Sequence, residues 1–346
     1  MLTGRERLEL REVAEPVPSD GDVVVRVRAV GICGTDLKIF HGEIPVAYPR
    51  VLGHEMVGET LGTSDGVPHA GSRVIVDPSV SCGRCDRCLE GRQNLCAAGW
   101  LLGRDRDGGL CELVAVPAAN VHPLPDAIDD VSAPFVQVLT TCVHGQRLTE
   151  IVPGDRVIVV GLGVTGLLHV QLARLFGAGF VVGVTRSPAK LRLAETLGAD
   201  VTVPTDEGSA FDRVMEATRG GGDVVIEAAG TVATLALAVR MARPGGRVLA
   251  YGTISETAGE FPFYELYYKE LVVSAPRAAV PTDFPVAIEA IASGRVRVEP
   301  LVSRGADLRT AGDAIGVLTT DDLKTIVRVS DGHGERAGMG ERRRDR

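Results

Sequence analysis

Four of the seven cysteines of this chain stand in one short stretch, SCGRCDRCLEGRQNLC, at residues 81–96. Four thiolates in a C-x2-C-x2-C-x7-C spacing can complete the tetrahedral shell of a zinc ion. A shell without a vacancy cannot bind a substrate, so we predict a structural zinc site here. A redox-active or metal-free cluster is the alternative. The four cysteines are Cys82, Cys85, Cys88 and Cys96.

A sparser set of metal-binding residue types lies upstream, in GICGTDLKIFHG at 31–42 and VLGHEMVGE at 51–59. Cys33, His54 and Glu55 offer one thiolate, one imidazole and one carboxylate. A zinc ion with three or fewer firm protein ligands keeps a position for water or an alcohol and lowers the pKa of the bound hydroxyl. A Cys and a His this far apart are more often unrelated residues, so this set alone is only a hypothesis.

A third candidate site is the glycine-rich segment VIVVGLGVTGLLHVQLARLFGAG, which begins at Val157. An apolar strand precedes its GxGxxG pattern and a segment of helical spacing follows it, which is the context of a dinucleotide site. The glycines permit a tight turn, and the pyrophosphate would lie at the start of the helix. A glycine-rich turn without a ligand is the alternative. The predicted binding residues of this turn are Gly161, Leu162, Gly163, Val164 and Gly166.

The next apolar strand, FVVGV, is followed by Thr185, Arg186 and Ser187, where an NAD site usually has an Asp or Glu for the ribose hydroxyl. Without that anion a 2'-phosphate is not repelled, and Arg186 with Lys190 could hydrogen-bond it. We therefore predict a preference for NADP(H) over NAD(H). The alternative is that both cations merely flank the strand end and the preference is loose.

The elements that must position these residues follow two patterns. Up to about residue 130, short β-type runs such as DVVVRVRAV are separated by Gly, Pro, Asp and Ser, which predicts a mostly β, barrel-like unit. Farther along, Val-rich and Ile-rich runs alternate with helical segments, the pattern of a parallel sheet covered by helices. The predicted fold class is α/β, and 346 residues with 45% apolar content suffice for two domains.

Composition narrows the partners. A net charge of -8 argues against binding to nucleic acid, which depends on Lys and Arg, so a small molecule is the expected partner. No stretch has the roughly 18 apolar residues of a membrane helix, and the N-terminus has no apolar leader segment. We expect no membrane association and a cytoplasmic location, where a cysteine cluster is more often a metal site than a disulfide framework.

Together these motifs resemble those of the zinc-containing medium-chain alcohol and polyol dehydrogenases, and the sorbitol and threonine dehydrogenases are the most similar branch. GICGTDLKIFHG, GHEMVGE, the cysteine stretch and VIVVGLGVTG follow the family's order and spacing, and the likeness covers residues 8–330. It implies a GroES-like, mostly β catalytic domain over 1–137 and a Rossmann domain, a doubly wound parallel sheet, over 138–272. Residues 273–330 would return to the catalytic domain. The tail 331–346 lacks apolar periodicity and is predicted to be disordered.

The resemblance also implies roles for individual residues. Cys33, His54 and Glu55 match the surroundings of the catalytic zinc, and Asp36 matches the carboxylate that orients the ligand histidine. Thr35 matches the hydroxyl that takes the substrate proton. With the lobe cysteines as structural ligands, two zinc ions per chain are expected.

Two positions depart from the family. The polyol branch has a Glu seven residues before a His, and that spacing from His144 lands on Gln137. We expect Gln137 near the catalytic zinc, where an amide oxygen can ligate it or bond its water. The alternatives are that Gln137 only orients substrate or packs, or a register that puts Ala133 there but needs four extra residues. In this account Cys33 and Glu55 balance the charge of the zinc ion.

The other departure is Lys38, which stands where many relatives have a proton-passing His. We expect no proton transfer from it, because a lysine would need a depressed pKa.

Two further expectations rest on the resemblance. FPFYELYYKELVVS at 261–274 matches the segment that leads into the family's subunit-contact strand, so we expect a homodimer or homotetramer; an ordinary domain core is the alternative. Residues at later strand ends should face the cofactor crevice, namely Ala229, Tyr251, Gly252 and Thr253.

The predicted function is that of a zinc-dependent oxidoreductase. It would transfer hydride between a nicotinamide cofactor and a secondary alcohol, polyol or amino alcohol and the corresponding ketone. One alternative is a zinc-independent quinone or enone reductase, which would leave Cys33, His54 and Glu55 unexplained. The other is a zinc-ribbon or cofactor-binding sensor without turnover.

Overall fold

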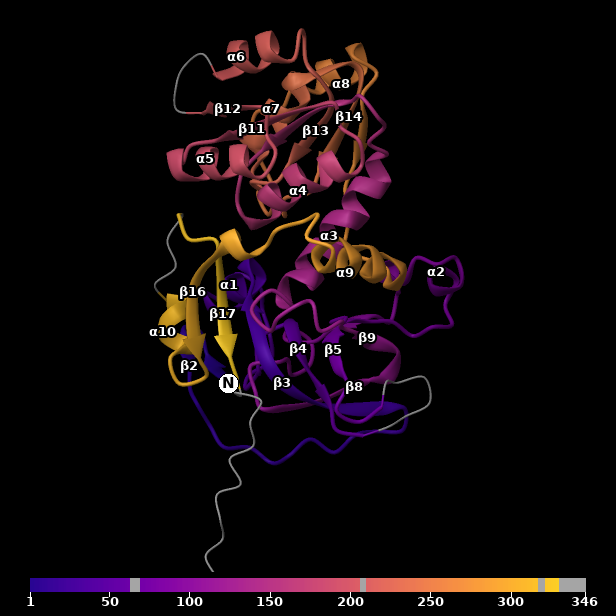
Figure 1. Cartoon of the computed structure of the whole chain (residues 1–346), viewed down its shortest axis with the longest axis vertical. Coiled ribbons are helices and arrows are strands. Elements are labelled where there is room, and N and C mark those ends of the chain that lie inside the picture. The colour runs from indigo at the N-terminus through magenta and orange to yellow at the C-terminus, as the bar shows by residue number, and fades with distance from the viewer. Residues whose placement is uncertain (63–68, 206–209, 317–320, 330–346) are drawn as a thin grey trace, which may run out of the picture.

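The computed structural model describes residues 1–62, 69–205, 210–316 and 321–329. Its two large sheets lie toward opposite ends of an elongated molecule, and the helices α3 (Pro134–Thr149) and α9 (Phe284–Ala292) lie between them (Figure 1). The predicted disordered tail 331–346 is outside the described residues.

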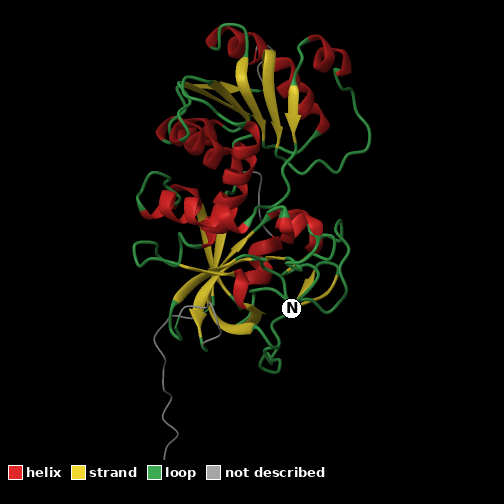
Figure 2. Cartoon of the chain, turned by 90° about the vertical axis from the view of Figure 1, so that its right-hand side faces the viewer, coloured by secondary structure: helices red, strands yellow, loops and turns green. Residues whose placement is uncertain are grey.

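One sheet is parallel and six-stranded, in the order β12-β11-β10-β13-β14-β15. Its Val and Ile side chains are mostly buried, because helices cover both faces (Figure 2). This confirms the predicted doubly wound sheet. The strands are β10 (Arg156–Val160), β11 (Phe180–Thr185), β12 (Val201–Pro204), β13 (Gly222–Glu227), β14 (Ala242–Ala250) and β15 (Val272–Ser274). The helices are α4 (Val164–Leu175), α5 (Pro188–Thr196), α6 (Ala210–Ala217), α7 (Val232–Met241) and α8 (Phe263–Tyr268).

The other sheet is seven-stranded, in the order β16-β17-β3-β4-β5-β9 with β8 also paired to β3. Its strands β16 and β17 come from the predicted return segment of the chain. Residues near 325 therefore lie beside residues near 30. The strands are β3 (Asp22–Ile32), β4 (Glu55–Thr60), β5 (Arg73–Val76), β8 (Leu113–Pro117), β9 (Val121–Pro123), β16 (Val302–Asp307) and β17 (Lys324–Arg328). The smaller elements are β1 (Leu2–Gly4), β2 (Arg7–Leu8), β6 (Ser79–Val80), β7 (Trp100–Leu101), α1 (Gly34–Phe40), α2 (Asp86–Leu89) and α10 (Ala311–Gly316).

Helix α3 joins the two halves and crosses the predicted domain boundary at 137/138. One hydrophobic cluster runs from Ile75 of the mostly β half, through α3, to Val157 and Val159 of the parallel sheet. Because α3 packs on both halves, it helps to fix their separation.

Candidate active site

Asp36 ties together the two segments that carry the predicted metal ligands. Cys33 stands between β3 and α1, and the Asp36 carboxylate accepts its backbone N–H at 2.9 Å. The same carboxylate accepts the N–H of Gly53, the residue before His54, at 3.1 Å. Asp36 is fully buried, so water does not compete for these bonds, which hold the backbone at Cys33 and next to His54 in place.

Asp36 also lies beside the imidazole of His54, which is the arrangement that the resemblance implies. Asp36 Oδ1 lies 3.3 Å from His54 Nδ1, which leaves the other ring nitrogen for a metal. Burial opposes a charged imidazole, but the Asp36 carboxylate and Cys33 raise the pKa of His54 well above its ordinary value. Surroundings that favour a proton on His54 also favour a metal cation beside it.

Glu55 has a partner that the sequence reasoning missed. Lys324 Nζ donates to both carboxylate oxygens of Glu55 at 2.8 Å and to the carbonyl of Ile32 at 3.1 Å. Both side chains are buried, and although burial opposes the charged ammonium, Glu55 and Cys33 raise the pKa of Lys324. Gly31 makes room for the pair, because a Cβ there would collide with a Glu55 oxygen. No local pattern could have indicated Lys324, since it pairs with Glu55 only through β17.

The structure brings Cys33, His54 and Glu55 together. Their ligand atoms all lie within 4.8 Å of one another, and all three residues line the cleft between the two halves of the molecule. Gln137, in the first turns of α3, lines the same cleft. One thiolate, one imidazole and one carboxylate gathered at a cavity suit a zinc ion that keeps an open position.

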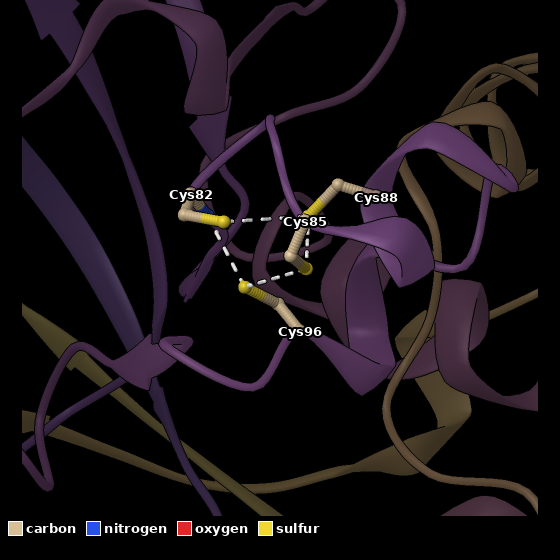
Figure 3. Close-up of side chains that lie close together, drawn as sticks. All are labelled: Cys82, Cys85, Cys88 and Cys96. Carbon is tan, nitrogen blue, oxygen red and sulfur yellow. Dashed lines mark hydrogen bonds between the residues drawn. The ribbon is translucent and has the colours of Figure 1, made fainter.

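The four lobe cysteines also converge (Figure 3). Sulfur–sulfur distances are 3.5 Å for Cys85 and Cys88, 3.8 Å for Cys85 and Cys96, and 4.0 Å for Cys82 and Cys88. Zn–S bonds of about 2.3 Å in a tetrahedron place the sulfurs roughly 3.8 Å apart, so this cluster fits the ion. The N–H groups of Cys88 and Ala97 lower the pKa of Cys85 to about 6, which favours the thiolate.

The glycine-rich turn has the predicted strand-turn-helix context. β10 ends at Val160, Gly161 has a φ of +90°, and Gly163 caps α4. A Cβ on Gly166 would collide with the carbonyl of Gly161, so only glycine lets the helix pack this close to the turn. These features fit a dinucleotide pyrophosphate at the start of α4.

The end of β11 is arranged partly as expected. Thr185, Arg186 and Ser187 join β11 to α5, and Arg186 is exposed. Lys190 differs from the expectation, because it is buried and faces Asp321 and Asp322. Burial lowers the pKa of Lys190 despite these two carboxylates. An ammonium already held in this way is less available to a 2'-phosphate than Arg186 is.

Glu227, at the end of β13, is a second residue that the sequence reasoning missed. Its buried carboxylate accepts the N–H groups of Ala229 at 2.8 Å and Gly230 at 2.7 Å, and its backbone carbonyl accepts those of Tyr251 and Gly252 at 2.9 Å. One residue therefore holds the two loops that follow β13 and β14. An acidic residue at the end of a buried strand was the available signal.

The cleft has a volume of about 1040 Å³ and receives residues from both halves. Besides the metal-binding set it is lined by Thr35, Lys38, Ala229, Tyr251, Gly252 and Thr253. The glycine-rich turn and the end of β11 do not line this cleft. Thr165, in the first turn of α4, does. The cleft therefore joins the predicted metal site to the predicted nicotinamide side.

Two side chains near the motifs, Cys142 and Lys38, have other contacts. Cys142 is fully buried and lies 3.5 Å from the Tyr251 hydroxyl, which also bonds Thr141 at 2.6 Å. Lys38 Nζ lies 3.5 Å from the carbonyl oxygen of Thr253, across the cleft.

Known proteins resemble this chain in sequence and in fold. Two family models match it, the alcohol dehydrogenase GroES-like domain over 19–126 and the zinc-binding dehydrogenase over 164–293. The sorbitol dehydrogenase of Halalkalibacterium halodurans is 31% identical, over 92% of this chain and 96% of its own.

Two solved structures are also similar. A zinc-binding dehydrogenase of Sinorhizobium meliloti bound to NADP is 36% identical with a TM-score of 0.87, and the match covers 94% of this chain and 97% of that one. An alcohol dehydrogenase of Escherichia coli complexed with NADH is 30% identical with a TM-score of 0.88, over 94% and 97%. In the described part of the chain, no helix has the length and apolar character needed to span a membrane.

The contacts of Glu227 predict that it positions the cofactor loops. Glu227→Ala removes the acceptor of two loop N–H groups, and we expect the Kd for nicotinamide dinucleotide to rise about tenfold, while Glu227→Gln retains more of the affinity. Titration calorimetry measures the Kd, and thermal unfolding separates loss of affinity from loss of fold. Glu216→Ala, on the exposed side of α6, is the control. An unchanged Kd in Glu227→Ala would contradict the assignment.

Proposed function

The chain belongs to the zinc-containing medium-chain alcohol and polyol dehydrogenases and is an oxidoreductase, and we propose that it interconverts a secondary alcohol or polyol and its ketone with NADP(H). The observation that carries this proposal is the cleft, where Cys33, His54 and Glu55 face the loops held by Glu227. The zinc-independent reductase is disfavoured, because it gives this cluster no role.

We propose that Cys33, His54 and Glu55, with Gln137 nearby, hold a catalytic zinc and that the lobe cysteines hold a second, structural zinc. When bound, the catalytic ion supplies Lewis acidity to the substrate oxygen, and the dinucleotide carries the hydride. Asp36 keeps the His54 ring in position for this site. Lys324 fixes the Glu55 carboxylate and offsets its charge, so the expected charge balance by Cys33 and Glu55 is incomplete.

The substrate proton is assigned to Thr35, whose side chain lines the cleft close to Cys33 in α1. Its hydroxyl can accept the proton of a substrate hydroxyl while it passes its own proton to water in the cleft, and the same relay runs backwards in the reverse direction. Lys38 lies one turn farther along α1 and points toward the Thr253 carbonyl. This contact supports a role for Lys38 in bridging the two halves rather than in proton transfer.

The proposed NADP(H) preference rests on the end of β11. No carboxylate stands among Thr185, Arg186 and Ser187, and Arg186 is exposed there. The NADP-bound relative is compatible with this proposal, and the NADH-bound relative shows that this fold accepts either cofactor. Gln137 as a direct zinc ligand is likewise a proposal, supported by its place in the cleft.

We propose that α8 and β15 form a contact between subunits of a homodimer or homotetramer. β15 is the edge of the parallel sheet, and Val272 and Val273 on it are exposed. Four aromatic side chains of α8 are also largely exposed, which a lone subunit would leave in contact with water. They are Phe263, Tyr264, Tyr267 and Tyr268.

The thiol-rich lobe supports the proposed cytoplasmic location.

Metal analysis tests the two zinc sites. We expect two zinc ions per chain in the wild type and one in Cys33→Ser, with kcat lowered by at least about 100-fold because an essential ligand is lost. Circular dichroism should show that Cys33→Ser remains folded. One zinc ion in the wild type, or full activity in Cys33→Ser, would refute the catalytic site.

Steady-state kinetics with both cofactors test the predicted preference. The wild type should have the higher kcat/KM with NADP, and Arg186→Ala should lower that value about tenfold while changing kcat/KM with NAD little, because only NADP carries the 2'-phosphate. Arg192→Ala, on the same helix as Lys190, is the control for a general loss of charge. A clear preference of the wild type for NAD would overturn the prediction.

Sedimentation equilibrium tests the subunit contact. The wild type should be a dimer or tetramer. The assembly formed by Val272→Glu should have a lower mass, because the contact would bury a carboxylate without a partner at the sheet edge. Val17→Glu changes another highly exposed valine and should leave the mass unchanged. A monomeric wild type rules out the oligomer.

A further inference from the structure

A reciprocal pair of hydrogen bonds joins the cysteine lobe to the loop after β15. Asn94, two residues before Cys96, donates from Nδ2 to the carbonyl oxygen of Arg277 at 2.7 Å. Arg277 donates from Nη1 to the carbonyl oxygen of Asn94 at 3.0 Å. Asn94 and residues 275–278 all line the cleft, so this contact holds together two parts of its wall.

His144, on α3, lies behind this contact. Its Nε2 is 3.3 Å from Asn94 Nδ2, and its Nδ1 is 3.0 Å from Asp283 Oδ2. Asp283 is fully buried, stands directly before α9 and also pairs with Arg147. The side chain of His144 is only 13% exposed, so few water molecules can replace these partners.

The hydrogen bonds of Asn94 fix the state of the His144 ring. The carbonyl oxygen of Arg277 can only accept, so the atom of Asn94 that faces it must be the amide nitrogen. The same nitrogen faces His144 Nε2, which must therefore be an acceptor without a hydrogen. The ring hydrogen is then on Nδ1, where Asp283 accepts it. These contacts together require a neutral ring in one tautomer.

A second proton on the ring is incompatible with this arrangement. It would place an N–H of His144 against the N–H groups of Asn94, with no acceptor between them. Turning the Asn94 amide would bring its oxygen to the ring, but the carbonyl of Arg277 would then lose its donor. The loop depends on such support, because Ala278 has a φ of +50°, which residues other than glycine rarely adopt.

The charged groups around the ring act in opposite directions. Among the described residues they are Asp283 from the segment before α9, Arg147 from α3 and Arg277 from the loop after β15. Asp283 favours a proton on the ring, and the two arginines oppose it. Burial opposes the charge of Asp283, but His144, the Val280 N–H and Arg147 lower the pKa of its carboxyl group. The carboxylate is therefore available to the ring in both protonation states.

We propose that His144 is a positioning residue, whose neutral ring holds Asn94 and, through it, the loop 275–278 at the wall of the cleft, and that protonation of the ring releases this loop. The effect on the loop is independent of the proposed dehydrogenase function. Its consequence for ligand binding rests on that function.

Hydrogen exchange of the zinc-loaded full chain tests the effect on the loop. In the wild type, peptides that cover 275–278 should exchange about three- to tenfold faster at about pH 6 than at about pH 8, after correction for intrinsic rates. In His144→Gln this difference should disappear, because the amide keeps an acceptor for Asn94 and takes up no proton. In His144→Phe the loop should exchange fast at both pH values. His41→Gln, which changes a histidine paired with Glu6, should behave as the wild type.

Binding of NADP, measured by titration calorimetry, tests whether the release reaches the cleft. The Kd should rise more between about pH 8 and about pH 6 in the wild type than in His144→Gln, by a factor of about three or more. Titration of the 2'-phosphate affects both proteins equally, so it cancels in this comparison.

The outcomes separate this inference from the function beneath it. Equal exchange of the loop at both pH values in the wild type, or unchanged exchange in His144→Phe, overturns the role of His144. The expected exchange with equal changes of Kd in the wild type and His144→Gln overturns its connection to the cleft. The expected exchange in a protein that binds no NADP at either pH supports the role of His144 and contradicts the proposed cofactor.

Discussion

A buried cluster of opposite charges fixes the side of the cleft where we propose that a metal ion binds. Asp36 bonds the backbone before His54 and lies beside its ring, while Lys324 holds both oxygens of Glu55. Removing one partner of a buried pair typically costs about 3–5 kcal/mol, because the other charge is left without compensation. Since Lys324 arrives on β17, the site is complete only when the C-terminal strands have joined the sheet begun by β3. The return of the chain is therefore part of the site and not an appendage to it.

The opposite side of the cleft uses a carboxylate in a comparable way. Glu227 gathers two loops with its side chain and its carbonyl group, and Tyr251 on the second loop reaches α3 through its bond to Thr141. Helix α3 also carries Gln137, four residues before Thr141, which lines the cleft near the proposed metal site. Both sides of the cleft therefore contact one helix, α3. This explains how groups from two sheets can be held opposite each other.

Local patterns predicted the parts of the molecule that depend on neighbouring residues. The cysteine spacing, the glycine-rich turn and the alternation of Val-rich strands with helices each lie within one short segment, and the structure contains all three. Lys324 and the contact of Asn94 with Arg277 could not be predicted, because their partners are 269 and 183 residues away. Lys190 was assigned from its position after β11 alone, and its burial against the segment around Asp322 depends on the folded arrangement of the two halves.

The contrast between the two proposed metal sites follows from the number and kind of their donors. Four sulfurs at nearly tetrahedral separations leave no vacancy, so the lobe can only support other parts of the structure. Three mixed donors beside a cavity leave the position that a reacting oxygen needs. The lobe is nevertheless connected to that cavity, because Asn94 lies two residues before Cys96 and bonds Arg277 directly. The lobe can therefore hold one side chain of the cleft in place, although the four sulfurs leave no position for a substrate.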